Sequence, residues 1–465
     1  MFINGKWITR KDFEIRNPYD STIIGAIPLL SREETKHAIA IASENKIFMK
    51  NLPINKRYKL LMGIANKLNS QKHAFAKIIS MDVGKPIKQS LSEVDKTINE
   101  FELSAFYSKE MRGETIPIDN GIILNRKEPI GVVGAITPFN FPLSLISHKI
   151  GPAIAAGNCV VLHPSPKAPL AAVELTKLIE ETLNELNIEL GVFTLLTGKG
   201  EVVGDEISKN EKINMVSFTG SNIVGESIIK NAGIKKVSLE LGGNNPMIVL
   251  KDSNIEKAAI SAVFSKFLNS GQVCISVGVV FIEESKADEF IKYVLENVKK
   301  LIIGNPLEDK TNIGPLITKE SAERVKTIIR ESIESNGKLL FGGECEGNTI
   351  YPTVLEINSN NILSKIEVFG PVLPIVRVSN ADEAIKYANN TEYGLQAGIY
   401  TNDINKAMEL SMELEYGGVM INNSPTFRQD NMPFGGIKKS GLRREGTKYT
   451  IDEMTELKTI VIHNA

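Results

Sequence analysis

Cysteine is scarce in this chain, which has only Cys159, Cys274 and Cys345 among its 465 residues. Three thiols are too few, and too odd a number, for a disulfide framework or a four-thiolate metal site. No stretch approaches the roughly 20 apolar residues that a membrane-spanning helix needs, and residues 1–7 lack the apolar core of a secretion signal. We therefore expect a cytoplasmic protein with no membrane partner, in which a single reactive thiol is the feature of interest.

An excess of charge of either sign is also missing. The 54 basic and 55 acidic residues leave a formal net charge of −1, which provides no electrostatic reason to expect a nucleic-acid partner. Hydrophobic residues make up 42% of the chain, enough for more than one core of ordinary domain size. We expect two domains, with or without a small appendage, and small-molecule ligands.

The sequence alternates short β-branched runs with longer segments of helical period from residue 131 onward. This alternation predicts parallel sheets with crossover helices. Apolar residues at spacings of three and four predict one long helix before this region, over Ile87–Arg112. In the first block we expect strands at Val132–Ile136, Cys159–Leu162, Val192–Leu196, Met215–Phe218 and Val237–Leu239, and helices at Pro169–Leu183 and Ile223–Asn231.

A second block with the same alternation begins near Gly242 and predicts a second α/β domain. Its expected elements are strands at Met247–Leu250, Val279–Ile282 and Val372–Val378 and helices at Asn254–Leu268, Ser285–Leu301 and Ser321–Ser335. The segments Gly121–Lys127 and Leu457–His463 read as extended, and neither can close a sheet alone. We expect them to pair, either within one chain or across a subunit boundary.

Cys274 follows a run of glycine and small polar residues that begins at Asn269. Such a run predicts an open loop, where a thiol can sit in a pocket and a nearby N–H can face a reacting atom. Most lone cysteines are instead small apolar core residues, and on this segment alone that interpretation is preferred. It suits Cys159, in an apolar run, and Cys345 is predicted to lie in a surface turn.

Glu240 ends an apolar strand and is followed by paired glycines. A carboxylate there is costly to bury unless it lies at the carboxyl end of a strand, where open α/β sheets bind their ligands. A glutamate whose pKa is raised by a partly apolar site suits general-base catalysis, although a structural salt bridge explains this segment equally well. Glycine-rich turns at 198–200 and 220–225 could receive an anion, but neither matches the dinucleotide fingerprint.

Seven segments, taken together, resemble the aldehyde dehydrogenase superfamily in the family's own order and over almost the whole chain. They are Glu128–Pro142, Ala156–Val161, Phe218–Ser221, Leu239–Gly243, Gly271–Cys274, Glu367–Pro371 and Pro433–Gly441. The resemblance implies an α/β fold with a Rossmann-type cofactor domain, an α/β catalytic domain and a small β oligomerisation element. The implied bounds are 1–110 and 130–241 for the first, 242–445 for the second, and 111–129 and 446–465 for the third.

The resemblance also implies NAD(P)-dependent oxidation of an aldehyde to a carboxylic acid, without a metal. Cys274 would form a thiohemiacetal whose oxyanion is held by Asn140 and the Cys274 N–H, and Glu240 would activate the water that hydrolyses the later thioester. A homodimer or homotetramer is implied, joined by the C-terminal strand. The cofactor would contact Thr137, Pro138, Phe139, His163, Ser165, Lys167, Gly220, Ser221, Leu241, Gly242, Glu367 and Phe369.

At the adenosine end the sequence departs from the family pattern. Pro166 occupies the position where NAD-preferring members carry a glutamate that binds the ribose hydroxyls. The carboxylate that would repel a 2′-phosphate is therefore missing, while Ser165, Lys167 and His163 offer donors. Either NAD or NADP is expected as cofactor, and we predict that NADP is accepted.

The substrate is predicted from positions that line the entrance in related enzymes, here Phe101, Phe106, Arg112, Val273, Phe427 and Arg428. An arginine there favours an oxygen-rich aldehyde, although surface solvation explains both arginines equally well. Val273 is apolar where related glyceraldehyde-3-phosphate and succinate-semialdehyde enzymes place arginine. This favours an uncharged 2-hydroxy aldehyde such as lactaldehyde, with those two activities as alternatives.

Two other classes fit parts of the pattern. A CoA-acylating dehydrogenase would pass the same thioester to CoA, but such relatives usually lack the glutamate that Glu240 matches. A non-catalytic binding protein on this fold is also conceivable, because fold does not determine function. The joint presence of Asn140, Glu240 and Cys274 argues against it.

Overall fold

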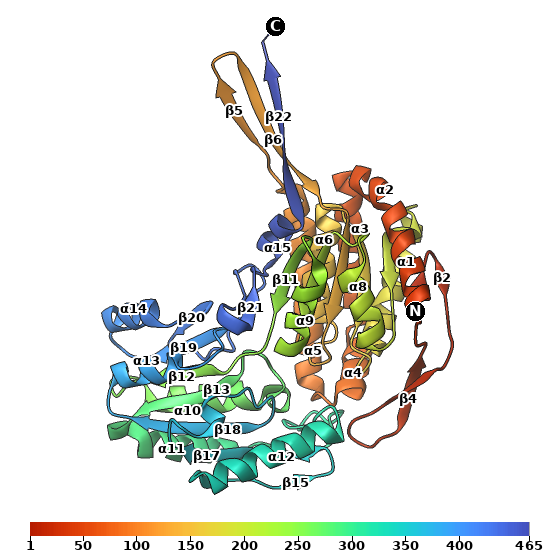
Figure 1. Ribbon diagram of the computed structural model, residues 1–465. Helices are drawn as coiled ribbons and strands as arrows, with labels where there is room; N and C mark the ends of the chain where they lie inside the picture. The colour runs from red at the N-terminus through yellow and green to blue at the C-terminus, as the bar shows by residue number, and fades with distance from the viewer. Residues whose placement is uncertain (465) are drawn as a thin grey trace.

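A computed structural model describes residues 1–464 and shows two sheets flanked by helices, with a three-stranded arm that projects from the body (Figure 1). The first sheet has eight strands in the order β2-β1-β9-β8-β7-β10-β11-β21, and its five central strands are parallel. These central strands confirm the five predicted ones to within two residues. Their bounds are β7 Val132–Thr137, β8 Cys159–Pro164, β9 Phe193–Leu195, β10 Met215–Thr219 and β11 Lys236–Glu240.

Short antiparallel strands close the edges of this sheet. Residues near the N-terminus form one edge, and a two-residue strand from the C-terminal region pairs with β11 at the other. A separate hairpin precedes the first helix. The bounds are β1 Phe2–Ile3, β2 Lys6–Trp7, β3 Phe13–Arg16, β4 Ile23–Ile27 and β21 Gly441–Leu442.

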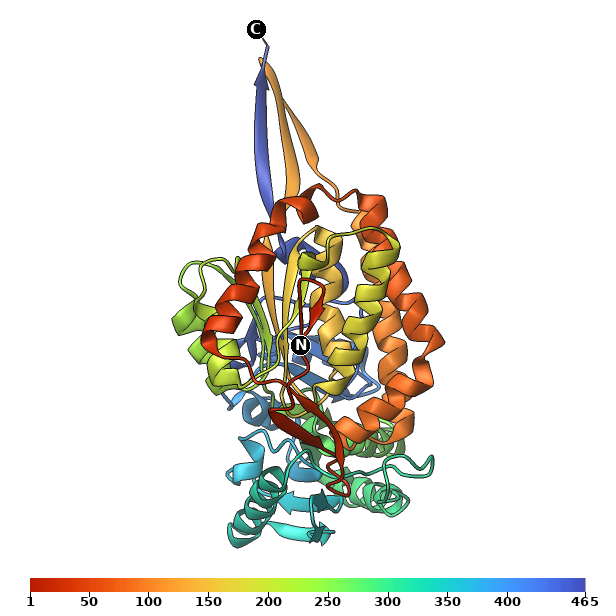
Figure 2. The same cartoon turned by 90° about the vertical axis from the view of Figure 1, so that its right-hand side faces the viewer.

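Helices cover both faces of the first sheet, and Figure 2 looks onto the layer formed by the orange and yellow helices. The long predicted helix is confirmed as α5, Ile87–Lys109, and it packs on α3, α4 and α6. The predicted helices at Pro169–Leu183 and Ile223–Asn231 are α7 and α9. The helices are α1 Arg32–Glu44, α2 Lys46–Asn51, α3 Ile54–Ser70, α4 Lys72–Val83, α6 Ser144–Ala156, α7 Leu170–Glu185, α8 Asp205–Lys209, α9 Asn222–Ala232 and α15 Thr447–Glu453.

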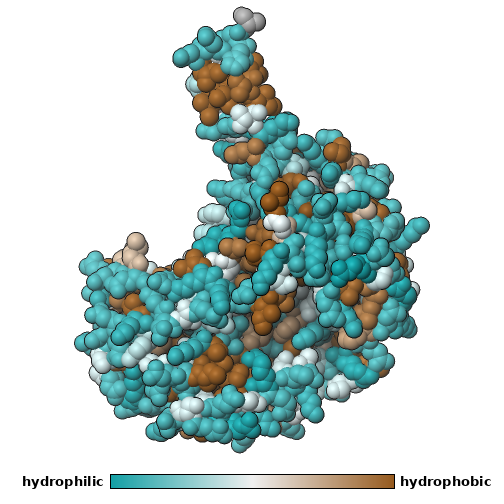
Figure 3. Space-filling view, in the orientation of Figure 1, coloured by the Kyte–Doolittle hydropathy of each residue, from teal (hydrophilic) through white to brown (hydrophobic). Residues whose placement is uncertain are grey.

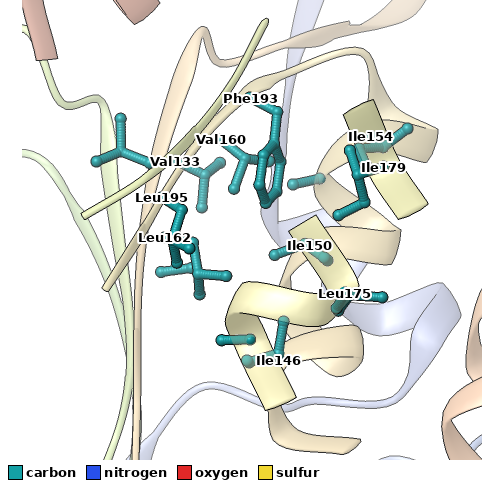
Figure 4. Packing of buried hydrophobic residues seen from close by; sticks show 14 of the residues in the cluster. Val133, Ile146, Ile150, Ile154, Val160, Leu162, Leu175, Ile179, Phe193 and Leu195 are labelled. Atoms are coloured by element: carbon teal, nitrogen blue, oxygen red, sulfur yellow. The ribbon is translucent and has the colours of Figure 1, made fainter. Parts of the chain in front are cut away.

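Every residue of α6 is buried, because this helix lies between the sheet and α5. Its isoleucines Ile146, Ile150 and Ile154 recur every four residues and share one cluster with Val160 and Leu162 of β8 (Figure 4). A helix that is buried all round is normally apolar all round. A charged residue in α6, such as Lys149, therefore requires a specific buried partner.

The second sheet has seven strands in the order β14-β17-β18-β13-β12-β19-β20, all parallel except at β14. It confirms the second predicted α/β block. Cys345 is half-buried and lies in a short hairpin, β15–β16, where a surface turn was expected. The strands are β12 Asn245–Val249, β13 Val277–Glu283, β14 Lys338–Phe341, β15 Cys345–Glu346, β16 Thr349–Ile350, β17 Thr353–Ile357, β18 Val372–Val378, β19 Gln396–Tyr400 and β20 Gly418–Ile421. The helices are α10 Ile255–Phe267, α11 Glu284–Val298, α12 Lys319–Glu334, α13 Ala381–Asn389 and α14 Ile404–Glu413.

The arm joins the two segments that were expected to be extended. Strand β22, Thr455–His463, pairs antiparallel with β6, Gly121–Pro129, over its whole length, and β5, Glu114–Ile118, pairs with the other side of β6. The pairing lies within one chain. No helix in residues 1–464 combines the length and the apolar character needed to cross a membrane.

Candidate active site

Glu240 is the last residue of β11 and lies at the carboxyl end of the parallel sheet, beside Thr219 of β10 and Gly441 of β21. It is only 3% exposed, and among residues 1–464 its Oε1 has no hydrogen-bond partner. A buried carboxylate oxygen without a partner is costly. The arrangement leaves that oxygen available to a ligand or a water molecule.

The loop before Cys274 has an unusual backbone. Asn269, Ser270 and Gly271 are consecutive residues with φ of 49°, 55° and 76°, a conformation that non-glycine residues seldom adopt. A Cβ on Gly271 would collide with the carbonyl oxygen of Gly370, so glycine is required there. Backbone strain of this kind persists only where surrounding contacts impose it, and it is common at functional sites.

Side chains from distant segments hold this loop. The amide of Asn269 donates to the carbonyl oxygen of Asn140 at 3.1 Å, and the Ser270 hydroxyl donates to the Gly314 carbonyl at 2.8 Å. On the other side of the thiol, the Asn245 amide donates to the carbonyl oxygen of Cys274 at 2.8 Å. Cys274 itself is half-buried.

Asn140 lies between β7 and α6 and is 3% exposed. Its Nδ2 donates to the carbonyl oxygen of Gln272, two residues before Cys274, at 3.0 Å. Its Oδ1 has no partner within the described part of the chain. The structure thus brings the amide of Asn140 to the loop that carries Cys274, as the sequence predicted. The hydrogen bond to Gln272 uses one N–H of that amide and leaves the other N–H for a ligand.

Burial governs the protonation of the two ionisable groups. Burial, followed by the charges of Glu240 and Glu367, raises the pKa of the Cys274 thiol. Burial, followed by the charge of Glu445, raises the pKa of Glu240 well above the ordinary glutamate value. Both groups therefore hold a proton more tightly than in water. The raised pKa makes the ionised Glu240 carboxylate a stronger base.

A buried ion network next to Glu240 was not found from the sequence. Lys149 of α6 and Glu445 form an ion pair at 2.7 Å, and Arg428 approaches the other oxygen of Glu445 at 3.2 Å. Burial opposes ionisation of Glu445, but Lys149 and Arg428 lower its pKa to about 2. A lysine inside the apolar run of α6 was the available signal, because a buried cation requires a buried anion.

Several of the residues expected to contact the cofactor lie together. The rings of Phe139 and Phe369 meet edge to face at 6.0 Å, and a Cβ on Gly242 would collide with the carboxylate of Glu367. Burial raises the pKa of Glu367 to about 7. Within residues 1–464 neither the Thr137 hydroxyl nor Oε1 of Glu367 finds a hydrogen-bond partner.

The other residues expected to contact the cofactor lie at or just after the ends of β7, β8, β10 and β11. His163 is buried with its Nδ1 3.0 Å from the Leu196 carbonyl oxygen, and burial lowers its pKa to about 4. It is therefore neutral near pH 7 and adds no positive charge, whereas Lys167 is exposed. The remaining expected contacts are the half-buried Pro138, Ser165 and Gly220, the exposed Ser221 that precedes α9, and the buried Leu241.

The expected substrate-side residues do not all lie in one place. Phe101 is fully buried in the first core against α6, which is a packing position. Arg112 is exposed, pairs with Glu110, and lines a recess at the base of the arm. Val273 is packed beside Cys274, while Arg428 is half-buried with its guanidinium 4.0 Å from the centre of the Phe434 ring. Phe106 and Phe427 are exposed.

Comparisons with known proteins decide the family. Residues 7–460 match the model of the family described as "Aldehyde dehydrogenase family". The chain belongs to the aldehyde dehydrogenase family. This aldehyde dehydrogenase is 63% identical, over 464 residues and 100% of both chains, to a lactaldehyde dehydrogenase of Methanococcus maripaludis.

Solved structures of the same family superpose closely on the enzyme. Glyceraldehyde-3-phosphate dehydrogenase GapN from Methanocaldococcus jannaschii, complexed with NADP, has a TM-score of 0.97 and 55% identity over 98% of this chain and 100% of that chain. The NADP-dependent glyceraldehyde-3-phosphate dehydrogenase from Bacillus halodurans, also complexed with NADP, has a TM-score of 0.96 and 36% identity over 100% and 99%. The enzyme is therefore an NAD(P)-dependent aldehyde dehydrogenase with this family's α/β fold.

Proposed function

We propose that this aldehyde dehydrogenase oxidises a small, uncharged 2-hydroxy aldehyde of the lactaldehyde type, with NADP as hydride acceptor. The apolar Val273 beside Cys274 carries the choice of substrate. A phosphate or carboxylate on the substrate needs a cation that is free to pair with it. Arg428 is directed at Glu445, at 3.2 Å, and Val273 next to Cys274 offers no charge. Relatives 63% identical that are named lactaldehyde dehydrogenase support the same substrate.

Cys274 is the nucleophile, and its sulfur adds to the aldehyde carbon. The negative charge that develops on the aldehyde oxygen is held by Nδ2 of Asn140 and by the N–H of Cys274. The bond from Asn140 to the Gln272 carbonyl supports this role, because it directs the amide toward the loop that carries the thiol.

The residues around the nicotinamide position fit the cofactor. The buried Thr137 hydroxyl and the Glu367 carboxylate, whose polar atoms lack partners in the described chain, would bind its ribose, and Phe369 would contact its ring. The chemistry that the bound nicotinamide supplies is hydride acceptance, after which the acyl group remains on Cys274 as a thioester.

Glu240 then takes a proton from the water that attacks the thioester, and the free acid leaves. The unpartnered Oε1 of Glu240 and its raised pKa support this assignment. Release by water separates this enzyme from the CoA-acylating class. Acid formed in the complete absence of CoA is the expected result.

NADP is the proposed acceptor because Pro166 removes the carboxylate that would repel a 2′-phosphate, while the exposed Lys167 can pair with it. The NADP complexes of GapN and of the Bacillus halodurans enzyme support this choice. The ratio of kcat/KM for NADP to that for NAD tests it, and a ratio well below one would refute it.

A substrate panel tests the proposal directly. With NADP fixed, we expect kcat/KM for lactaldehyde to exceed that for glyceraldehyde 3-phosphate and for succinate semialdehyde by at least about tenfold, since an unpaired anion in an apolar pocket is costly. Glyceraldehyde without its phosphate is the matched control for carbon number. It should be oxidised better than its phosphate ester.

Glyceraldehyde 3-phosphate is the second candidate, because the GapN structure at 55% identity carries that activity in its name. Under this alternative Arg428 would leave Glu445 and pair with the substrate phosphate. The variant Arg428→Gln distinguishes the two candidates. It should change the ratio of lactaldehyde to phosphate-ester oxidation little under the first proposal, but should raise it strongly under the second.

We also propose that the enzyme is a homodimer or homotetramer joined through its arm. The arm projects from the body and carries a brown apolar surface (Figure 3), with Leu457, Ile460, Val461 and Ile462 exposed. Contiguous apolar surface of this kind marks a protein interface. Strand β20 ends the seven-stranded sheet and offers an edge for another copy. Light scattering on Ile460→Asp/Ile462→Asp should show a monomer, and an unchanged mass would refute the proposal.

A further inference from the structure

A fully buried ion pair lies behind the loop that carries Asn140. Lys85, between α4 and α5, contacts Oε2 of Glu93 in α5, and both side chains have 0% exposure. The cost of removing two charges from water commonly cancels their attraction, so a buried ion pair is weak evidence for stability. The other contacts of these two residues indicate a different role.

Glu93 caps the start of α6 from a neighbouring helix. Its second oxygen, Oε1, accepts hydrogen bonds from the N–H groups of Leu143 at 2.9 Å and Ser144 at 3.2 Å. In the structure of residues 1–464, Leu143 at the start of α6 makes no side-chain capping bond, so Glu93 supplies the missing acceptor from another helix. A carboxylate is also favourable at the positive end of a helix. The backbone is thereby anchored three residues after Asn140.

Lys85 contacts Phe141, which lies between Asn140 and the start of α6. Its ammonium group lies 3.7 Å from the centre of the Phe141 ring, a cation–π contact inside the protein. Phe141 packs with Val273 and Phe434 in the cluster that includes Cys274. The ion pair therefore contacts Phe141, directly after Asn140, and the first backbone N–H groups of α6 at Leu143 and Ser144.

We propose that Lys85 and Glu93 are positioning residues that set the direction of the Asn140 amide. Asn140 has a single side-chain hydrogen bond, to Gln272, and its Oδ1 has no partner in residues 1–464, so its orientation depends on the backbone that carries it. Stabilisation of an oxyanion depends on donors that are fixed before the reaction. This inference rests on the proposed role of Asn140 as an oxyanion donor.

A double-mutant cycle between Glu93→Gln and Asn140→Ala tests the proposal. The readout is the rate of the first NADPH burst, measured in stopped flow at saturating lactaldehyde and NADP. Asn140→Ala alone should slow the burst about 100- to 1,000-fold, the usual effect of losing one oxyanion donor. Glu93→Gln alone should slow it about 10- to 100-fold, as small misplacements of catalytic groups do. The double variant should be within about twofold of Asn140→Ala, since Glu93 acts through Asn140.

Controls separate positioning from loss of structure. Ser80→Ala removes a buried hydrogen bond to Ser90 at the same helix junction and should leave the burst rate unchanged. NADP affinity and the rate of Cys274 alkylation by iodoacetamide should also be unchanged in Glu93→Gln. If Glu93→Gln does not fold, the neutral pair Lys85→Met/Glu93→Gln replaces it in the cycle, because removing both buried charges costs less than removing one.

The possible outcomes distinguish the positioning role of Glu93 from the oxyanion role of Asn140. Effects that multiply in the double variant would overturn the positioning role while leaving Asn140 as oxyanion donor. A wild-type burst in Asn140→Ala would instead overturn the proposed role of Asn140. A wild-type burst in both Glu93→Gln and the neutral pair would overturn the positioning role directly.

Discussion

Replacing Glu240 with glutamine should stop the enzyme after one turnover. Glutamine has nearly the same shape but cannot accept the proton of the attacking water, so the thioester on Cys274 should accumulate. General-base catalysis typically contributes about 100- to 10,000-fold, which corresponds to about 3 to 5 kcal/mol of transition-state stabilisation. We expect steady-state turnover to fall by that factor.

The first turnover should survive in this variant. After burial, the charge of Glu240 is the next contribution to the raised pKa of the Cys274 thiol, so removing that charge does not hinder thiolate formation. Stopped flow should show a burst of about one NADPH per subunit, and intact mass spectrometry should detect the acyl adduct. Full turnover in Glu240→Gln, or a burst without an adduct, would refute the role of Glu240.

The same substitution has an effect on stability whose sign is determined by the raised pKa. The folded-state pKa of Glu240 is above its unfolded value, so its contribution is fully present below the unfolded pKa and is lost as the pH rises through the folded pKa. Glutamine does not titrate. The Tm of Glu240→Gln minus that of wild type should therefore increase as the pH rises above about 4.3, the ordinary glutamate value. A difference that stays constant or falls would contradict the burial argument.

Three further predictions concern other parts of the site. Cys274→Ser should lower aldehyde oxidation by at least about 1,000-fold with NADP binding intact, while Cys345→Ser should leave it unchanged; equal activity in both variants would exclude Cys274 as nucleophile. Pro166→Glu should shift the kcat/KM ratio toward NAD by about tenfold or more, because the new carboxylate repels the 2′-phosphate. The lowered pKa of Glu445 implies stability that is present above its unfolded pKa and is lost as the pH falls toward about 2. Lys149→Met should therefore flatten the acid side of the Tm profile, and an unchanged profile would argue against the ion pair.

The central elements of both sheets were predictable because their signals are local. Buried parallel strands such as β7 and β8 are continuous β-branched runs, and α5 shows its packing face at spacings of three and four. The edge strands β1 and β21 were not predicted. Each has only two residues, too few for any periodic pattern, and each depends on a partner strand far along the chain.

The proposed catalytic residues could be named from the sequence for another reason. Asn140, Glu240 and Cys274 each lie in a short segment whose residue types match a family with known chemistry. Their buried supports were not predictable in this way. Lys149 and Glu445 are 296 positions apart, so no local pattern links them.

The sequence by itself determined the central strands of both sheets, the long helix α5, the family and the class of reaction. The tertiary structure decided which charges are free. It paired Arg428 with Glu445, placed Arg112 at the arm, and buried Phe101 in the core. The physical reason is one of range along the chain. The periodic patterns that predict strands and helices extend over a few residues, whereas the counter-ion of a buried charge can come from any segment that folding places beside it.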